Sequence, residues 1–178
     1  MSFAIRLYRD ADHAAVRDLF IRINAELAPQ ELREAFARYL EVSLRDEIDR
    51  LAEYYAERQG SFWVAYDGTR LAGMFGLERV GTPAAELRRM YVDAAHRKRG
   101  LARTMLERAE RICREAGTPV LTLSTSELQQ AALAFYRRAG YRLVGEEVGA
   151  AQSNKTVGGA IRRYHFEKQL GRTSPSLT

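Results

Sequence analysis

The chain has 178 residues, of which 46% are hydrophobic and 29% are charged, and its formal net charge is +5 at pH 7. This composition matches an ordinary globular protein and excludes a disordered or fibrous chain, and the length suits one domain with a substantial core. No apolar run approaches the length of about 18 residues that a membrane span requires, and the first residues lack the pattern of a secretory signal. We therefore expect a cytoplasmic protein with no membrane partner.

Metal, disulfide and nucleic-acid chemistry find little support in the sequence. Cys113 is the only cysteine, which excludes an internal disulfide and disfavours a cysteine-based zinc site. His13, His96 and His165 lack the spacing of metal ligands, so we expect no metal. The basic residues are spread along the chain and interleaved with acidic ones, so we also expect no nucleic-acid partner.

The first part of the chain predicts a strand followed by helices. Residues 3–9 alternate apolar and polar side chains, which predicts a strand. Apolar residues then recur at helical spacing, which predicts a helix that Pro29 ends. Residues 30–58 resume the helical spacing, and Ser43 and Asp46 suggest a restart near the middle of this segment, so we expect two helices there.

A hairpin signal marks the beginning of the predicted sheet. The dipeptide Asp67-Gly68 tolerates positive φ and separates two strand-like segments, residues 61–66 and 70–78. Further along, the patterns predict a strand over 85–92, a helix over 101–116, a strand over 119–123, a helix over 127–139, and strands over 141–147 and 160–168.

These elements predict a single domain of the α/β (α+β) class. With one helical segment counted before Pro29 and one after it, the order is β-α-α-β-β-β-α-β-α-β-β, which describes a mixed sheet flanked by helices. We expect the domain to span residues 1–170 and residues 149–159 to form a flexible loop. The Ser-, Thr- and Pro-containing tail, residues 171–178, is expected to be disordered.

A short basic segment with a glycine lies between a predicted strand and a predicted helix: Arg97, Lys98, Arg99, Gly100, Leu101 and Ala102. Backbone N–H groups at a helix start lack partners and lie at the positive end of the helix dipole, so the segment predicts an anion site. Gly100 leaves no side chain where an anion approaches the backbone, and Ala102 keeps the first turn thin. An ordinary solvated turn can show the same pattern, so the signal is weak by itself.

The surroundings of this segment resemble the GNAT superfamily of N-acetyltransferases. The pattern Arg-x-x-Gly-x-Ala at 97–102, preceded by Met-Tyr-Val at 90–92 and followed by an amphipathic helix, is similar to the signature loop of that family. Residues 132–141, which contain Phe-Tyr and Gly-Tyr pairs, are similar to its second motif. The predicted element order is also that of the family, so the resemblance covers about residues 3–170 and implies a mostly antiparallel sheet of seven strands.

The resemblance implies acetyl-CoA as co-substrate and assigns residues to it. Met90, Tyr91 and Val92 would contact the pantetheine arm, in a gap between their strand and the strand over 119–123, although core packing also explains Met90 and Val92. The segment from Arg97 to Ala102 would hold the pyrophosphate. Phe135, in the second motif, is also assigned to the cofactor site.

Glu86 stands out for a physical reason as well. A central strand covered on both faces should be nearly apolar, yet Glu86, Arg88 and Arg89 are expected to put charge on both faces of this one. Either the strand borders a polar cleft or its first half is a solvated end. The resemblance favours the cleft and implies that Glu86 is the general base, directly or through water; the alternative is a structural ion pair with Arg88 or another arginine.

Tyr136 matches the tyrosine that donates a hydrogen bond or a proton to the departing CoA sulfur in the family. Its alternative role is ordinary packing, because Leu133 and Tyr136 have the i,i+3 spacing of one helix face. The implied reaction is direct attack of a primary amine on the thioester, with a backbone N–H near Tyr91 or Val92 polarising the carbonyl. Cys113 lies on a predicted apolar stripe, so an acyl-enzyme is disfavoured.

The acceptor is not specified by the sequence. In the family, acceptor choice resides in segments that correspond here to residues 24–60 and 149–159, and a small-molecule amine or a peptide N-terminus would fit. The family often has Asn where this chain has Gln129, so we assign Gln129 no role. A homodimer would be consistent with the family, although no clear interface is evident. The rival interpretation is a non-catalytic module that binds acyl-CoA or a protein partner on the same fold.

Overall fold

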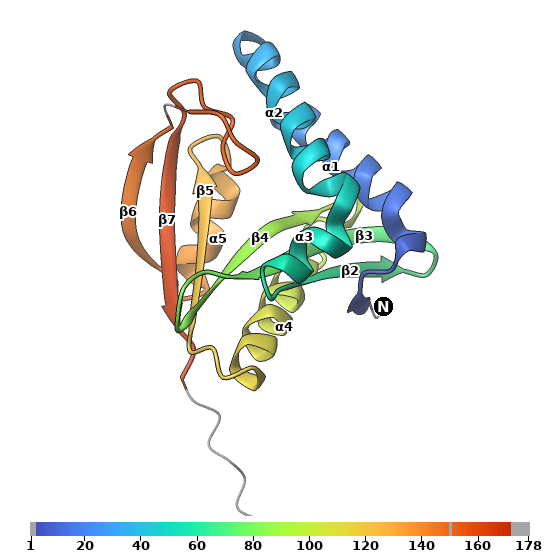
Figure 1. The fold of residues 1–178 in the computed structure, drawn as a ribbon, viewed down its shortest axis with the longest axis vertical. Helices are drawn as coiled ribbons and strands as arrows, with labels where there is room; N and C mark the ends of the chain where they lie inside the picture. The colour runs from blue at the N-terminus through green and yellow to red at the C-terminus, as the bar shows by residue number, and fades with distance from the viewer. Residues whose placement is uncertain (1–2, 150, 172–178) are drawn as a thin grey trace, which may run out of the picture.

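A seven-stranded mixed sheet forms the centre of the protein in the computed structural model, which describes residues 3–149 and 151–171 (Figure 1). The strand order is β1-β2-β3-β4-β5-β7-β6, and every neighbouring pair is antiparallel except β4 and β5. The strands are β1 (Ala4–Leu7), β2 (Ser61–Asp67), β3 (Arg70–Arg79), β4 (Ala84–Val92), β5 (Val120–Ser126), β6 (Arg142–Val148) and β7 (Arg162–Gln169). The predicted mixed, mostly antiparallel sheet is confirmed.

Five α-helices accompany the sheet within the described residues: α1 (His13–Leu27), α2 (Arg33–Asp46), α3 (Leu51–Glu57), α4 (Leu101–Glu115) and α5 (Gln130–Arg138). Three of them precede the hairpin, which confirms the two helices predicted within residues 30–58; the condensed element order counts these two as one segment. The break between α2 and α3 falls at Glu47, whose φ of −138° and ψ of −62° are not helical. None of the described helices is long and apolar enough to cross a membrane.

Alternation along the strands builds two hydrophobic cores, one on each face of the sheet. In β2, Phe62 and Val64 belong to a core formed with the first three helices, whereas Trp63 and Ala65 pack in a core formed with α4 and α5. Because neighbouring strand residues point to opposite faces, one strand can serve both cores. The helices therefore cover both faces of the β1–β4 half of the sheet.

One predicted boundary shifts because the chain remains extended beyond the predicted strand over 119–123. β5 continues to Ser126, and the N–H of Glu127 still donates to the carbonyl of Arg162 at 2.9 Å. This bond holds residue 127 beside the start of β7 in the turn that follows β5, and α5 begins only at Gln130. The predicted disordered tail lies outside the described residues except for Gly171.

The sheet splits between its two central strands. β4 and β5 pair over four residues each, ending at Leu87 opposite Leu123, and within the described residues they form no further bridge. Figure 1 shows the two strands diverging beyond this point. A bulge bends β4 there: Met74 is opposite Tyr91 and Gly76 opposite Arg88, so β4 has an extra residue between them. Because bulges bend a strand and increase its twist, this one directs the end of β4 away from β5.

Candidate active site

A cleft of about 110 Å³ lies where β4 and β5 separate. Its walls come from β4, β5, the helix α5, the strand β7, helix α2 and the segment after β6. A second cavity of about 60 Å³ adjoins it and shares four lining residues with it: Tyr39, Tyr91, Gln129 and Arg163. The gap that the family resemblance implies between these strands is therefore present, and it opens into a polar cleft.

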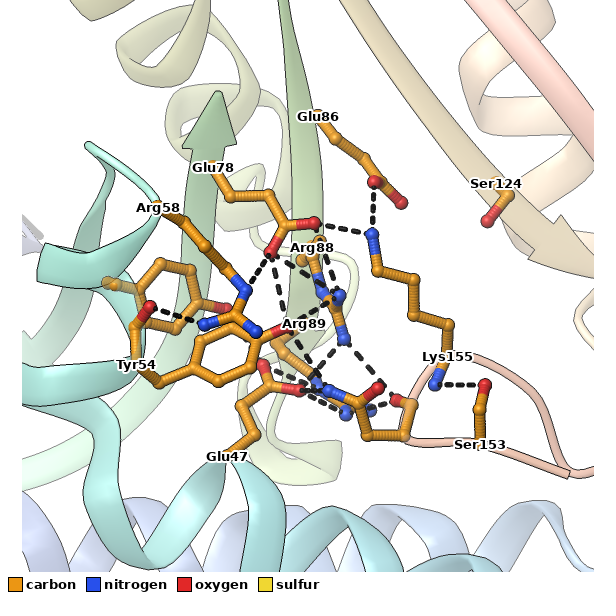
Figure 2. Close-up of polar contacts among 12 residues, drawn as sticks. Glu47, Tyr54, Arg58, Glu78, Glu86, Arg88, Arg89, Ser124, Ser153 and Lys155 are labelled. Atoms are coloured by element: carbon orange, nitrogen blue, oxygen red, sulfur yellow. Dashed lines mark hydrogen bonds and ion pairs between the residues drawn. The ribbon is translucent and has the colours of Figure 1, made fainter. Parts of the chain in front are cut away.

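The two arginines of β4 have one common partner, Glu47 (Figure 2). Nη2 of Arg88 donates to the Glu47 carboxylate at 2.8 Å, and Nη2 of Arg89 donates to it at 2.6 Å. The prediction that these charges lie on both faces of the strand is wrong. Arg89 has a positive φ of 51° and lies in the bulge, so two consecutive side chains reach the same carboxylate.

Glu47 is fully buried and nevertheless ionised. Burial alone would raise the pKa of Glu47, but the two guanidinium groups outweigh burial and hold its pKa below the ordinary value. Its carboxylate also accepts hydrogen bonds from Tyr55 at 2.9 Å and from the side chain of Asn154 at 3.1 Å. The charge on β4 is thus neutralised inside the protein, which excludes a solvated strand end.

Glu86 lines the cleft, and its ion pair is with a lysine. Nζ of Lys155 lies 2.9 Å from the Glu86 carboxylate and also contacts Glu78 (Figure 2). The alternative that Glu86 pairs with Arg88 or another arginine is wrong about the partner, because Arg88 already binds Glu47 and Glu78. With 18% of its side chain exposed, Glu86 remains accessible from the cleft. Its role as general base stays a prediction.

The segment 149–159 is packed where the sequence predicted a flexible loop, as far as its described residues show. The carbonyl of Asn154 accepts from Arg88 and Arg89, and Gln152 donates to the carbonyl of Ala35 at 2.8 Å. A β-bridge between Ser153 and Thr156 closes a turn. The two segments to which acceptor choice was assigned therefore meet, since Ala35 belongs to the first of them, and both line the cleft, through Tyr39 and Asn154.

Tyr136 lines the cleft and also packs in the hydrophobic core. Only 7% of the residue is exposed, and its ring packs against Tyr141 and Phe166. Burial raises the pKa of the Tyr136 phenol well above its ordinary value, and nearby Tyr91 acts in the same direction. The hydroxyl therefore stays protonated as a donor. The ring of Phe135 packs edge-on against that of Tyr136, with the ring centroids 5.2 Å apart, and is absent from the described lining; its assignment to the cofactor site stays a prediction.

The residues assigned to the pantetheine arm follow the last β4–β5 pair. Met90 and Tyr91 line the cleft. Val92 does not, but its carbonyl accepts a hydrogen bond from Nε of Arg97 at 3.3 Å. Because the described part of β5 forms no bridge with these residues, the β5-facing edge of β4 is available to a ligand here.

The start of α4 has the geometry of an anion site. Gly100 has a φ of +80°, and a Cβ built on it would meet no described atom within 4 Å, so the space above it is open. Among the described residues, the backbone N–H groups of Gly100, Leu101 and Ala102 have no acceptor. The side chain of Leu101 is buried in the core, so only its backbone can contact a ligand.

The three cations of this segment differ in their surroundings. Arg97 forms an ion pair with Glu26 at 2.8 Å, and Arg99 forms one with Asp67 at 2.9 Å. Lys98 is exposed and has a positive φ of 60°. The ion pairs hold two of the side chains at the protein surface, so the backbone of the segment is the main feature offered to an anion.

Several cleft residues were not predicted as site residues. They are Tyr39, Ser124, Asn154, Lys155 and Arg163, which come from segments far apart in the sequence. Gln129, which was assigned no role, also lines the cleft and accepts a hydrogen bond from Thr125 at 2.8 Å. Tyr39, Asn154 and Lys155 lie in the two segments to which acceptor choice was assigned, and for Arg163 the available signal was a charged side chain within a predicted strand, by the same reasoning that singled out Glu86.

Within the described residues, a split mixed sheet, a helix start with open backbone N–H groups and a cleft lined by a carboxylate and a buried phenol form the arrangement expected of a CoA-dependent acyltransferase. A family model described as the acetyltransferase (GNAT) family matches residues 28–141. The chain belongs to this family.

Relatives and solved structures agree with this assignment. Human N-acetyltransferase 8 is 28% identical over 120 residues, which cover 64% of this chain and 53% of that protein, so the match spans about half the length of this relative. A GNAT-family acetyltransferase from Staphylococcus aureus has a similar fold, with a TM-score of 0.74, 17% identity, and coverage of 96% of this chain and 100% of that one. The PaiA N-acetyltransferase of Thermoplasma acidophilum in complex with coenzyme A gives a TM-score of 0.68, at 21% identity, covering 95% and 99%.

Proposed function

We propose that this protein transfers an acetyl group from acetyl-CoA to a primary amine by direct attack in a ternary complex. The observation that carries the proposal is the split between β4 and β5, whose cleft is lined by Glu86 and Tyr136. Membership of the acetyltransferase family supports it. A CoA complex of a protein with the same fold supports acetyl-CoA as co-substrate.

The cofactor would lie along the edge of β4 and end at the start of α4. The backbone N–H groups of residues 100–102 would hold the pyrophosphate at the positive end of the helix dipole. The pantetheine arm would pass between β4 and β5, beside Met90 and Tyr91, and would bring the thioester to Tyr136. Holding both substrates in one cleft would supply much of the rate.

The reaction needs one base and one acid. The neutral amine attacks the thioester carbonyl, a C–N bond forms, and the amine proton passes to Glu86 directly or through water. A backbone N–H near Tyr91 or Val92 stabilises the oxyanion. The C–S bond then breaks, and the phenol of Tyr136 donates its proton to the departing thiolate. Each group faces the cleft or borders it in the structure.

A covalent intermediate on Cys113 is disfavoured. Its thiol is 3% exposed within the core under α4. Burial, together with nearby Glu110, raises the pKa of Cys113 to about 11, so the thiolate is scarce at neutral pH.

A thermal-shift titration followed by a thiol-release assay tests the proposal. Acetyl-CoA at about one hundred times its Kd should add about 2.7 kcal/mol of stability. CoA release with a panel of amines should then show turnover. Binding without turnover would favour the rival interpretation, a non-catalytic acyl-CoA-binding module, and absence of binding would contradict both. Cytoplasmic location, lack of a metal and a homodimer stay predictions.

A further inference from the structure

Arg163 is a cation at the junction of the two cavities. Its side chain lines both, and within residues 3–149 and 151–171 no carboxylate lies within ion-pair distance of it. The other cations of the cleft, Arg88, Arg89 and Lys155, each bind a carboxylate. The one hydrogen bond that Arg163 donates among the described residues goes to Oγ of Ser124. Most of its N–H groups therefore remain available.

The hydrogen bond to Ser124 places the guanidinium at the start of the split. Ser124 follows Leu123, the last residue of β5 that pairs with β4. Arg163 is also opposite Ser126 in the β5–β7 register, and Ser124 and Ser126 share one face of β5. Thr122 lies on the same face and is opposite Glu86. Glu86 and Arg163 thus lie on one face of the sheet, on the two strands that flank β5.

The acidic groups near Arg163, within the described residues, already contact other side chains. Glu86 is paired with Lys155, and Glu147, which is opposite Arg163 in the β6–β7 register, lies 3.1 Å from His165. Burial lowers the pKa of the Arg163 guanidinium below its ordinary value. A partly buried cation without a carboxylate is costly, and a bound anion would compensate for it.

We propose that Arg163 binds a carboxylate of the acceptor, which makes the acceptor an amino acid or a related amine with a carboxylate close to the reacting nitrogen. This inference rests on the proposed acetyltransferase function. A guanidinium matches the planar geometry of a carboxylate and can bind it through two hydrogen bonds.

The spacing of the strands limits the distance between amine and carboxylate. Neighbouring strands are about 4.8 Å apart. An amine bound in the split between β4 and β5 would therefore lie roughly one strand spacing from the paired strands β5 and β7, along which the side chain of Arg163 extends. An α-amino acid, with its carboxylate one carbon from the amine, covers this distance together with the hydrogen bonds from its carboxylate to the guanidinium, which are about 2.9 Å long. The phosphates of CoA are assigned elsewhere, at the start of α4, and a peptide N-terminus has no carboxylate next to its amine.

Matched acceptor pairs test the inference in the full chain. Each pair differs only in the carboxylate: phenylalanine with phenethylamine, tyrosine with tyramine, and tryptophan with tryptamine. For the pair that turns over fastest, kcat/KM should favour the amino acid, and Arg163→Gln should reduce kcat/KM for the amino acid by about 10- to 100-fold. The variant should change kcat/KM for the decarboxylated amine by less than about threefold and leave the KM for acetyl-CoA unchanged.

Arg162→Gln is the matched control. Arg162 lies on the same strand, is exposed, and pairs with Glu146 at 2.9 Å on the surface, so its loss should leave the preference intact. Arg163→Lys keeps the charge but not the planar fork and should restore part of the preference.

The outcomes separate this inference from the proposed function. Turnover of amines without any preference for a carboxylate, or a preference that survives in Arg163→Gln, overturns the role of Arg163 and leaves the acetyltransferase function standing. A higher KM for acetyl-CoA in the variant overturns it too, because Arg163 would then contact the cofactor. If no amine is acetylated, the proposed function fails, and calorimetry with N-acetylphenylalanine and the CoA-loaded protein tests the carboxylate site separately. Binding that is lost in Arg163→Gln supports the carboxylate site. Equal binding by both proteins, or no binding by either, overturns it.

Discussion

At the scale of single residues, the fold places the two proposed catalytic side chains in different environments. Tyr136 is held in an aromatic core with its phenol at the cleft, so burial keeps it protonated. Glu86 is more exposed and is oriented by an ion pair with Lys155. A proton donor must hold its proton at the working pH and a base needs access to the substrate, and these environments meet both conditions.

Replacing Tyr136 by phenylalanine should lower kcat by about 10- to 100-fold with little change in folding, because the ring packing remains and the proton donor is lost. In the wild type, the pKa of Tyr136 is raised above the ordinary phenol value of about 10, so ionisation of Tyr136 should cause no fall in kcat below about pH 10. A kcat–pH profile with circular dichroism on both proteins checks this. Full activity in the variant would refute the assigned role.

Glu86→Gln should lower kcat/KM by about 100-fold at neutral pH, because glutamine keeps a hydrogen bond to Lys155 but cannot accept the amine proton. The measurement is thiol release between pH 6 and 9. A purely structural Glu86 predicts near-normal rates with lower stability, so the two readouts distinguish the roles. Exposed Glu41→Gln on α2 is the control and should behave as the wild type.

At the scale of elements, the bulge in β4 and the break between α2 and α3 depend on each other. The bulge turns Arg88 and Arg89 to one side, and the break places Glu47 between them. Asn154, from the segment before β7, completes the cluster. A network of buried charges therefore fixes the cleft wall, and its members come from a strand, a helix junction and a loop.

Replacing Glu47 by glutamine should destabilise the protein by about 3–5 kcal/mol, because two buried guanidinium groups lose their carboxylate. The free energy of unfolding in urea measures this, again with Glu41→Gln as control. The pKa of Glu47 is lowered on folding, so its contribution is present above the ordinary carboxyl value of about 4.3 and disappears as the pH falls through the folded-state pKa. The difference between wild type and variant should therefore shrink in acid; a difference that grows there would contradict the assignment.

Gly100→Ala should weaken acetyl-CoA binding by at least about tenfold, because alanine resists the positive φ and places a methyl group in the space open to a phosphate. Gly68→Ala is a close control: Gly68 also has a positive φ, of 59°, with no atom within 4 Å of its Cβ position, but it lies in the hairpin. Both variants should lose similar stability, about 1 kcal/mol, and only Gly100→Ala should lose affinity in calorimetry. Equal loss of affinity would remove the helix start from the site.

At the scale of the whole molecule, the cleft depends on the two central strands of the sheet, β4 and β5, which pair at one end and separate at the other. Four residues of β4 pair with four of β5, and beyond them the β1–β4 half and the β5–β7 half separate (Figure 1). The segment around Asn154 and Lys155 connects the second half back to the first through the buried charges. A ligand in the split would contact both halves.

Binding of CoA should therefore slow amide exchange on both sides of the split. We expect protection in residues 88–92 and 124–126 and at the start of α4, and no change in the β1–β2 pair, which is remote from the cleft lining. Hydrogen exchange with and without CoA measures this. Uniform protection of the sheet, or protection confined to α4, would show that the arm does not enter the split.

The sequence by itself determined most of the elements and pointed to the loop that we propose as the cofactor site. Alternation in β2, helical spacing in the helices and the Asp67-Gly68 turn depend on local backbone geometry, so they could be recognised without the fold. The same holds for residues 97–102 and for Tyr136, whose motifs are contiguous. Glu86 was found because a charge in a central strand is costly wherever the strand lies.

Only the tertiary structure decided which charges are paired. Glu47 joins Arg88 and Arg89 across about 40 residues of sequence, and Lys155 reaches Glu86 from a segment predicted to be flexible. The bulge that turned Arg89 depends on the register with β3, which local patterns do not specify. Arg163 became a candidate only once every nearby carboxylate had another partner, because electrostatic compensation depends on distances between residues that are remote along the chain.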